Sequence, residues 1–150
     1  MVYMKGMRQL GHYDLTTGEV LPNVNLYAIA PKRRNGFGRW LAMSQDNGVD
    51  LAVMHRELGS AGYAALWYVI GIADFENKVA FTKADAAAKL EMLPSAFSRA
   101  FKRLVTAGLV REAEKIGNTK TYVISPEVVW RGSSRNHHAA LKAWRQRKGE

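Results

Sequence analysis

The sequence contains no cysteine, and this absence excludes several kinds of chemistry. Without a thiol the chain has no disulfide framework, no thiolate nucleophile and no cysteine-ligated zinc or iron–sulfur centre. Long apolar runs are also missing, since the most apolar stretch, residues 61–75, is too short to span a bilayer and contains Asp74. Residues 1–10 lack the apolar core of a signal peptide. We therefore expect a cytoplasmic protein that does not enter a membrane.

Acidic residues are few beside the basic ones, with 13 Asp and Glu against 22 Lys and Arg. The formal net charge is +9, and an excess of this size favours a polyanionic partner: DNA, RNA or an anionic membrane surface. The 150 residues are 47% hydrophobic, which is enough for one compact domain with extensions. Net charge alone does not distinguish these partners, so the positions of the charged residues along the chain are needed.

Residues 1–48 are expected to form an N-terminal extension. Residues 13–21 and 25–30 have the turn residues and the alternation of a β-hairpin. Residues 37–43 have a helical pattern, which continues towards the next segment with an interruption at Asn47-Gly48.

Residues 49–132 are predicted to form the main domain. Ser60 can cap a helix that runs to about Phe75, and residues 79–81 follow as a short strand. Thr82 is a good N-cap for the next helix, with Asp85 three residues later as in an approximate capping box. Three apolar residues mark the buried side of this helix: Ala86, Ala87 and Leu90.

The strongest helical pattern runs from Ser95 to Ala107. Its apolar residues recur at helical spacing along one stripe: Phe97, Ala100, Phe101, Leu104 and Val105. The remaining face is polar and holds Ser95, Ser98, Arg99, Lys102, Arg103 and Thr106. Leu93-Pro94 separates this helix from the one before it, and Gly108 suits a left-handed cap at its end.

Residues 109–116 and 120–124 then flank Gly117-Asn118-Thr119 as the two strands of a hairpin. A short helix, a break, an amphipathic basic helix and a hairpin are the order of a winged helix-turn-helix. The predicted fold class is therefore α+β, mainly α: a winged helix-turn-helix with an N-terminal β-hairpin extension and a C-terminal basic helix.

The polar face of the 95–107 helix suits the major groove of double-stranded DNA, because the helix carries three basic residues and no acid. Arg99 can grip O6 and N7 of a guanine together, and Ser95 and Ser98 suit phosphate or base contacts near the helix N-terminus. The hairpin tip can follow the adjacent minor groove or backbone. The predicted DNA-binding residues are Ser95, Ser98, Arg99, Lys102, Arg103, Thr106, Lys115, Asn118, Lys120, Arg135, Lys142 and Arg145.

The last three of these belong to residues 133–150, which are predicted to form a C-terminal basic amphipathic helix. One side of this helix would pack: His137, Ala140, Leu141 and Trp144. The other side would be basic: Arg135, His138, Lys142 and Arg145. Two roles remain open, a stripe along phosphates and a clamp that holds a homodimer together through Leu141 and Trp144.

Catalysis is not expected. His137-His138 has no third ligand at a suitable spacing, so we predict neither a metal site nor a cofactor. A nicking enzyme of the rolling-circle type would need two histidines separated by one apolar residue, and the chain has no such pair. It also lacks a Gly-rich phosphate loop with a lysine.

Several blocks resemble the plasmid replication protein family RepL. They comprise residues 74–77, 82–90, 95–104 and 108–110, then Ser125-Pro126, Trp130-Arg131-Gly132 and Asn136-His137-His138. The helix-turn-helix portion is also similar to MarR-type regulators. One departure is Glu91, at a position where such turns usually carry Gly.

The resemblance implies binding to an origin or operator on a plasmid, with a role in replication initiation or copy control. We also expect a homodimer, with host replication proteins as further partners. The alternatives are a MarR-like transcriptional repressor at an operator and, less favoured, a nicking initiator.

Overall fold

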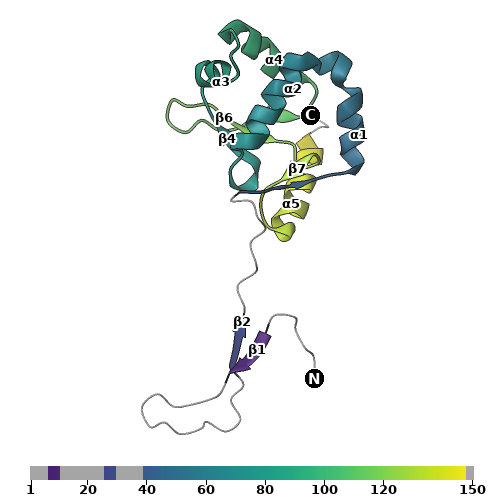
Figure 1. Ribbon diagram of the computed structural model, residues 1–150, viewed down its shortest axis with the longest axis vertical. Helices are drawn as coiled ribbons and strands as arrows, with labels where there is room; N and C mark the ends of the chain where they lie inside the picture. Colours follow the sequence, from purple (N-terminus) through teal and green to yellow (C-terminus); the bar gives the residue numbers. More distant parts are fainter. Residues whose placement is uncertain (1–6, 11–25, 30–38, 148–150) are drawn as a thin grey trace. The chain divides into compact units, whose positions relative to one another are not determined.

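The computed structural model describes residues 7–10, 26–29 and 39–147, which fall into two units divided after Gly38. In the first unit β1 (Met7–Leu10) pairs antiparallel with β2 (Leu26–Ile29), with Met7 opposite Ile29 (Figure 1). Strand β2 falls within the predicted strand 25–30, and the partner that the structure shows for it is β1, whereas residues 13–21 were expected. A turn signal indicates where a chain can reverse, whereas pairing depends on cross-strand contacts that the signal does not contain. Residues 13–21 themselves lie outside the described residues.

The second unit, residues 39–150, is mainly helical with a small antiparallel sheet (Figure 1). Its elements are β3 (Ala42–Met43), α1 (Asp46–Val53), α2 (His55–Ile72), the 3₁₀ turn η1 (Phe75–Asn77), β4 (Lys78–Ala80), α3 (Lys83–Lys89), α4 (Pro94–Thr106), β5 (Val110–Glu112), β6 (Thr121–Ile124), β7 (Val129–Trp130) and α5 (Ser134–Gln146). The main sheet has the order β4-β6-β5, and β3 pairs with β7. Helices α3 and α4 followed by the β5–β6 hairpin make this an α+β winged helix-turn-helix.

The start of this unit differs from the helical pattern expected at residues 37–43. Ala42 and Met43 form a strand opposite Trp130 and Val129, and Ser44 continues the pairing by donating its amide to Val128, at 2.9 Å. Helix α1 begins only at Asp46 and passes through Asn47-Gly48, where an interruption was expected. The expectation failed because a two-residue strand is defined by its distant partner β7 and has no local periodicity of its own.

Helix α2 has its break one residue before the predicted N-cap Ser60. Gly59 adopts φ +64° and ψ 179°, a conformation that interrupts the helix and that glycine reaches without a Cβ penalty. The continuous part then runs to Ile72, three residues short of the expected end at Phe75. The face of α2 towards the interior includes Leu58, Ala65 and Val69, all fully buried.

The core lies between α2, α3, α4 and the sheet, and α4 supplies its centre. Four of the five predicted stripe residues are buried: Phe97, Ala100, Phe101 and Leu104. Val105 is 42% exposed, because at 100° per residue it falls on the edge of the stripe.

Aromatic rings fill the space between α4 and the sheet. Phe101 contacts Tyr122 edge to face at 4.8 Å between ring centroids, and Phe81 meets Phe97 in the same way at 5.9 Å. Burial, followed by the Glu112 carboxylate, raises the pKa of the Tyr122 phenol above its ordinary value. The ring therefore packs as a neutral aromatic group at physiological pH.

Local signals at the ends of α3 and α4 are confirmed. The Thr82 hydroxyl accepts from the Asp85 amide at 3.1 Å and donates to the Asp85 carboxylate at 2.6 Å. Pro94 occupies the first turn of α4. At its other end Gly108 adopts φ +74°, while Leu109 and Gly108 donate their amides to Leu104 and Val105. This is the paired hydrogen bonding of a Schellman cap.

Candidate nucleic-acid interface

Helix α4 turns a polar face outward on the side opposite to the core. Ser95, Arg99, Lys102 and Thr106 are exposed and Ser98 is half-buried. The helix carries no acid, and no side chain of the described residues caps its N-terminus, whereas Thr82 and Ser133 cap α3 and α5. Amide donors, hydroxyls and cations therefore share one outward surface, and this combination suits a polyanion.

The turn between α3 and α4 keeps its geometry in spite of Glu91. This residue adopts φ +54°, the left-handed conformation that glycine would take without strain. Met92 donates its amide to Ala87 at 2.9 Å and Glu91 donates to Ala88 at 3.2 Å, so α3 also ends in a Schellman cap. The departure from the expected Gly changes the backbone strain of the turn and leaves its shape intact.

Arg103 differs from the other cations of α4 because it has a partner within the chain. One of its Nη atoms donates to the Leu58 carbonyl at 3.1 Å, next to the Gly59 break in α2. A Cβ at position 59 would lie 3.3 Å from the same nitrogen. Arg103 thus ties α4 to α2, a structural contact that the sequence did not predict.

Arg99, Lys102 and Arg103 meet in one shallow hollow of about 490 Å³ beside Glu57. The cations of α4 are therefore a group at one place on the surface, and Glu57 is the carboxylate beside them among the described residues.

The wing tip is a tight two-residue turn. Ile116 and Thr119 exchange backbone hydrogen bonds of 3.0 and 3.1 Å around Gly117, whose φ is +61°. Lys115 and Asn118 are exposed there. Lys120 lies 3.3 Å from Glu112, and both side chains are half exposed, so solvent weakens this ion pair. Of the two predicted wing lysines, Lys115 is therefore the one that forms no ion pair with the described part of the chain.

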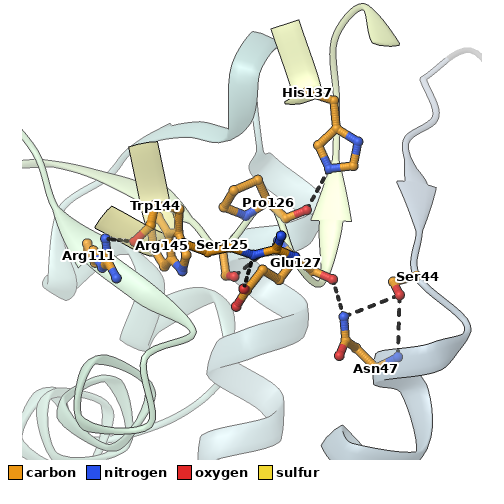
Figure 2. Close-up of polar contacts among 9 residues, drawn as sticks. All are labelled: Ser44, Asn47, Arg111, Ser125, Pro126, Glu127, His137, Trp144 and Arg145. Atoms are coloured by element: carbon orange, nitrogen blue, oxygen red, sulfur yellow. Dashed lines mark hydrogen bonds and ion pairs between the residues drawn. The ribbon is translucent and has the colours of Figure 1, made fainter. Parts of the chain in front are cut away.

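Helix α5 packs on its own chain through the predicted side. Trp144 is buried, and the Arg111 guanidinium of β5 lies 3.7 Å from the centre of its ring. Arg111 also donates to the Trp144 carbonyl at 3.0 Å (Figure 2). His137 stacks on Trp130 with ring centroids 5.0 Å apart, and its Nε2 lies 2.7 Å from the Pro126 carbonyl oxygen. Trp144, proposed as one half of a dimer clamp, is thus covered by residues of the same chain.

The basic side of α5 is exposed at Arg135 and Lys142, whereas Arg145 lies 3.1 Å from the Glu127 carboxylate (Figure 2). Figure 1 shows α3 and α4 at one end of this unit and α5 beside β7 at the other. The structure therefore brings the predicted residues of α4 together on one face and does not place those of α5 on it.

A polar cluster that the sequence did not identify as such joins η1 to β7 and α5. Asn77 is fully buried, donates to the carbonyls of Ile124 at 3.1 Å and Val129 at 2.7 Å, and accepts from the Arg131 amide at 2.9 Å. Glu76 donates its amide to the Arg131 carbonyl at 2.6 Å and accepts from Asn136 at 2.7 Å.

Residues 74–77, 130–132 and 136–138, which are separated in the sequence, therefore meet in this cluster. Its residues hold the fold together, and a local motif could not reveal the hydrogen bonds between them.

The described residues lack two kinds of feature. They contain no group of three or more His, Asp or Glu placed to hold a metal ion. Within the same part of the chain no helix is both long and apolar enough to cross a membrane.

Comparison with known proteins gives a distant likeness among solved structures. No model of a known protein family matches the chain, and no curated protein matches its sequence. Among solved structures the chain is similar to the AntR antimony-specific transcriptional repressor, with 18% identity and a TM-score of 0.36. The alignment covers 81% of this chain and 100% of that one.

Proposed function

We propose that this chain is a sequence-specific double-stranded-DNA-binding protein without catalytic activity. The observation that carries the proposal is that α4 is amphipathic. One side of the helix supplies the centre of the core, and the other side is an acid-free face with Arg99 and Lys102. A helix held this firmly by its apolar side can enter the major groove as a rigid element. The exposed wing tip with Lys115 would lie along the neighbouring minor groove or backbone.

Within this interface Arg99 has the position of a base reader. It is exposed on α4, in the same hollow as Lys102, and none of the ion pairs among the described residues includes it. Its planar guanidinium can donate to O6 and N7 of one guanine, whereas Lys102 acts as a point charge towards phosphate. Ser95, beside the uncapped helix N-terminus, suits a phosphate oxygen.

The biological role that we propose is control of plasmid replication at an origin, which rests on the resemblance of several blocks to the RepL family. Repression at an operator in the manner of MarR-type regulators requires the same DNA-binding surface, so the position of the bound site has to separate the two. Selection of bound fragments from the plasmid or genome that encodes the protein would show whether they lie at an origin or upstream of a promoter.

The test of DNA binding itself is selection from a random duplex pool, followed by affinity measurements with Arg99→Ala. We expect this change to weaken specific binding by about 1–3 kcal/mol and to relax preference at one base pair. Lys78→Ala, which removes an exposed cation of β4, is the charge control and should keep the base preference. Failure to recover any preferred sequence would refute the proposal. Equal loss on specific and random DNA would assign Arg99 to a phosphate.

A further inference from the structure

A second hollow lies between α5 and the wing strands, away from the polar face of α4. Its volume is about 520 Å³, within the range of small-molecule sites in proteins. Its walls are largely apolar and include Val123 of β6 with Ala140, Ala143 and Trp144 of α5. The two alanines leave room between the helix and the sheet, and Trp144 and Pro126 help to enclose it.

Two glutamates and two arginines line this hollow. Glu112 already pairs with Lys120 at 3.3 Å, and Glu76 accepts a hydrogen bond from Asn136 at 2.7 Å. Arg111 and Arg147 also line the hollow, and neither has a carboxylate partner among the described residues. Arg111 gives one donor to the Trp144 carbonyl, and its remaining N–H groups and those of Arg147 can meet an anion next to an apolar wall.

Trp144 joins the apolar wall to the cationic groups. It lines the hollow, and its ring lies under the Arg111 guanidinium, 3.7 Å from the ring centre.

From these observations we infer that the hollow binds a small amphipathic anion, a ligand with a compact apolar body and one carboxylate or sulfonate group. The apolar body would lie against Trp144 and the alanines of α5, and the anionic group would face Arg111 and Arg147. A planar guanidinium can hold such a group through two parallel hydrogen bonds.

Binding here would also be coupled to DNA binding, a consequence that rests on the proposed function. Arg111 belongs to β5 of the wing and contacts α5 through the Trp144 ring and carbonyl, so a ligand that engages this guanidinium acts on the joint between wing and α5. If the ligand changes the affinity of the protein for DNA by some factor, DNA changes the affinity of the protein for the ligand by the same factor.

The experiment titrates the full chain with 1-anilinonaphthalene-8-sulfonate, a fluorescent amphipathic anion. We expect saturable binding with one site per chain. Ala143→Leu, which fills the hollow with a larger apolar side chain, should abolish it while the circular dichroism spectrum is kept. Arg147→Gln should weaken it by about tenfold, because an ionic hydrogen bond is lost. Trp67→Ser removes an exposed indole of α2 and should leave binding unchanged.

Undiminished binding to Ala143→Leu or to Arg147→Gln would overturn the assignment, and so would loss of binding in Trp67→Ser. These titrations contain no DNA, so their outcome is independent of the proposed function. Repeating them with saturating specific DNA tests the coupling: we expect a changed probe affinity, and an identical one would overturn the coupling.

Discussion

Replacement of Asn77 tests the view that a buried polar cluster fixes the sheet to β7. In Asn77→Ala three hydrogen bonds disappear, two donated by the side chain and one accepted by it. At about 1 kcal/mol net for each bond the loss is about 3 kcal/mol, and the partners left buried add to it. Asn77 also adopts φ +61°, where an alanine costs about 1–2 kcal/mol. We expect a total destabilisation of about 4–5 kcal/mol.

Urea unfolding followed by circular dichroism measures this free energy, and two variants separate its parts. Asn77→Gly loses the same hydrogen bonds but accepts the positive φ, so it should be about 1 kcal/mol less destabilised than Asn77→Ala. Asn77→Asp keeps an acceptor for the Arg131 amide but cannot donate to Ile124 and Val129, and it buries a charge, so it should lose at least as much as Asn77→Ala. If Asn77→Ala unfolds within about 1 kcal/mol of the natural protein, the cluster does not hold the fold as argued.

Two further changes address the turn and the wing. Glu91→Gly should stabilise the protein by about 0.5–1 kcal/mol in the same unfolding assay, because glycine adopts φ +54° without strain. The gain is only partial, since glycine also raises the conformational entropy of the unfolded chain. A destabilised variant would contradict the strain argument. Lys115→Gln should make the slope of log DNA affinity against log salt shallower by about 0.9, as one phosphate contact is lost. Lys120→Gln, the matched change at the lysine paired with Glu112, should lose less affinity, and equal effects would show that the ion pair does not matter.

Much of the winged helix-turn-helix could be predicted from the sequence because its signals are local. The spacing of Phe97, Phe101 and Leu104 defines the buried side of α4, and the caps at Thr82 and Gly108 need only residues within one or two helical turns. The outward polar face of α4 follows from the same periodicity. Its residues could therefore be assigned to one surface before any coordinates were known.

The tertiary structure decided what depends on residues distant in the chain. Strand β3 exists because β7 lies opposite it, and β1 pairs with β2 in a register that no turn residue specifies. Arg103 and Arg145 looked like free cations, yet Leu58 and Glu127 lie within reach of them in the folded chain.

The same limit applies to Asn77 and Trp144. Periodicity could place Trp144 on the packing side of α5, but only the fold puts Arg111 over its ring and an apolar hollow beside it. Asn77 carries no local pattern at all, because its three partners belong to β6, β7 and the residue that follows β7. Sequence patterns report which face of an element is apolar, and the contacts between elements form only when the chain has folded.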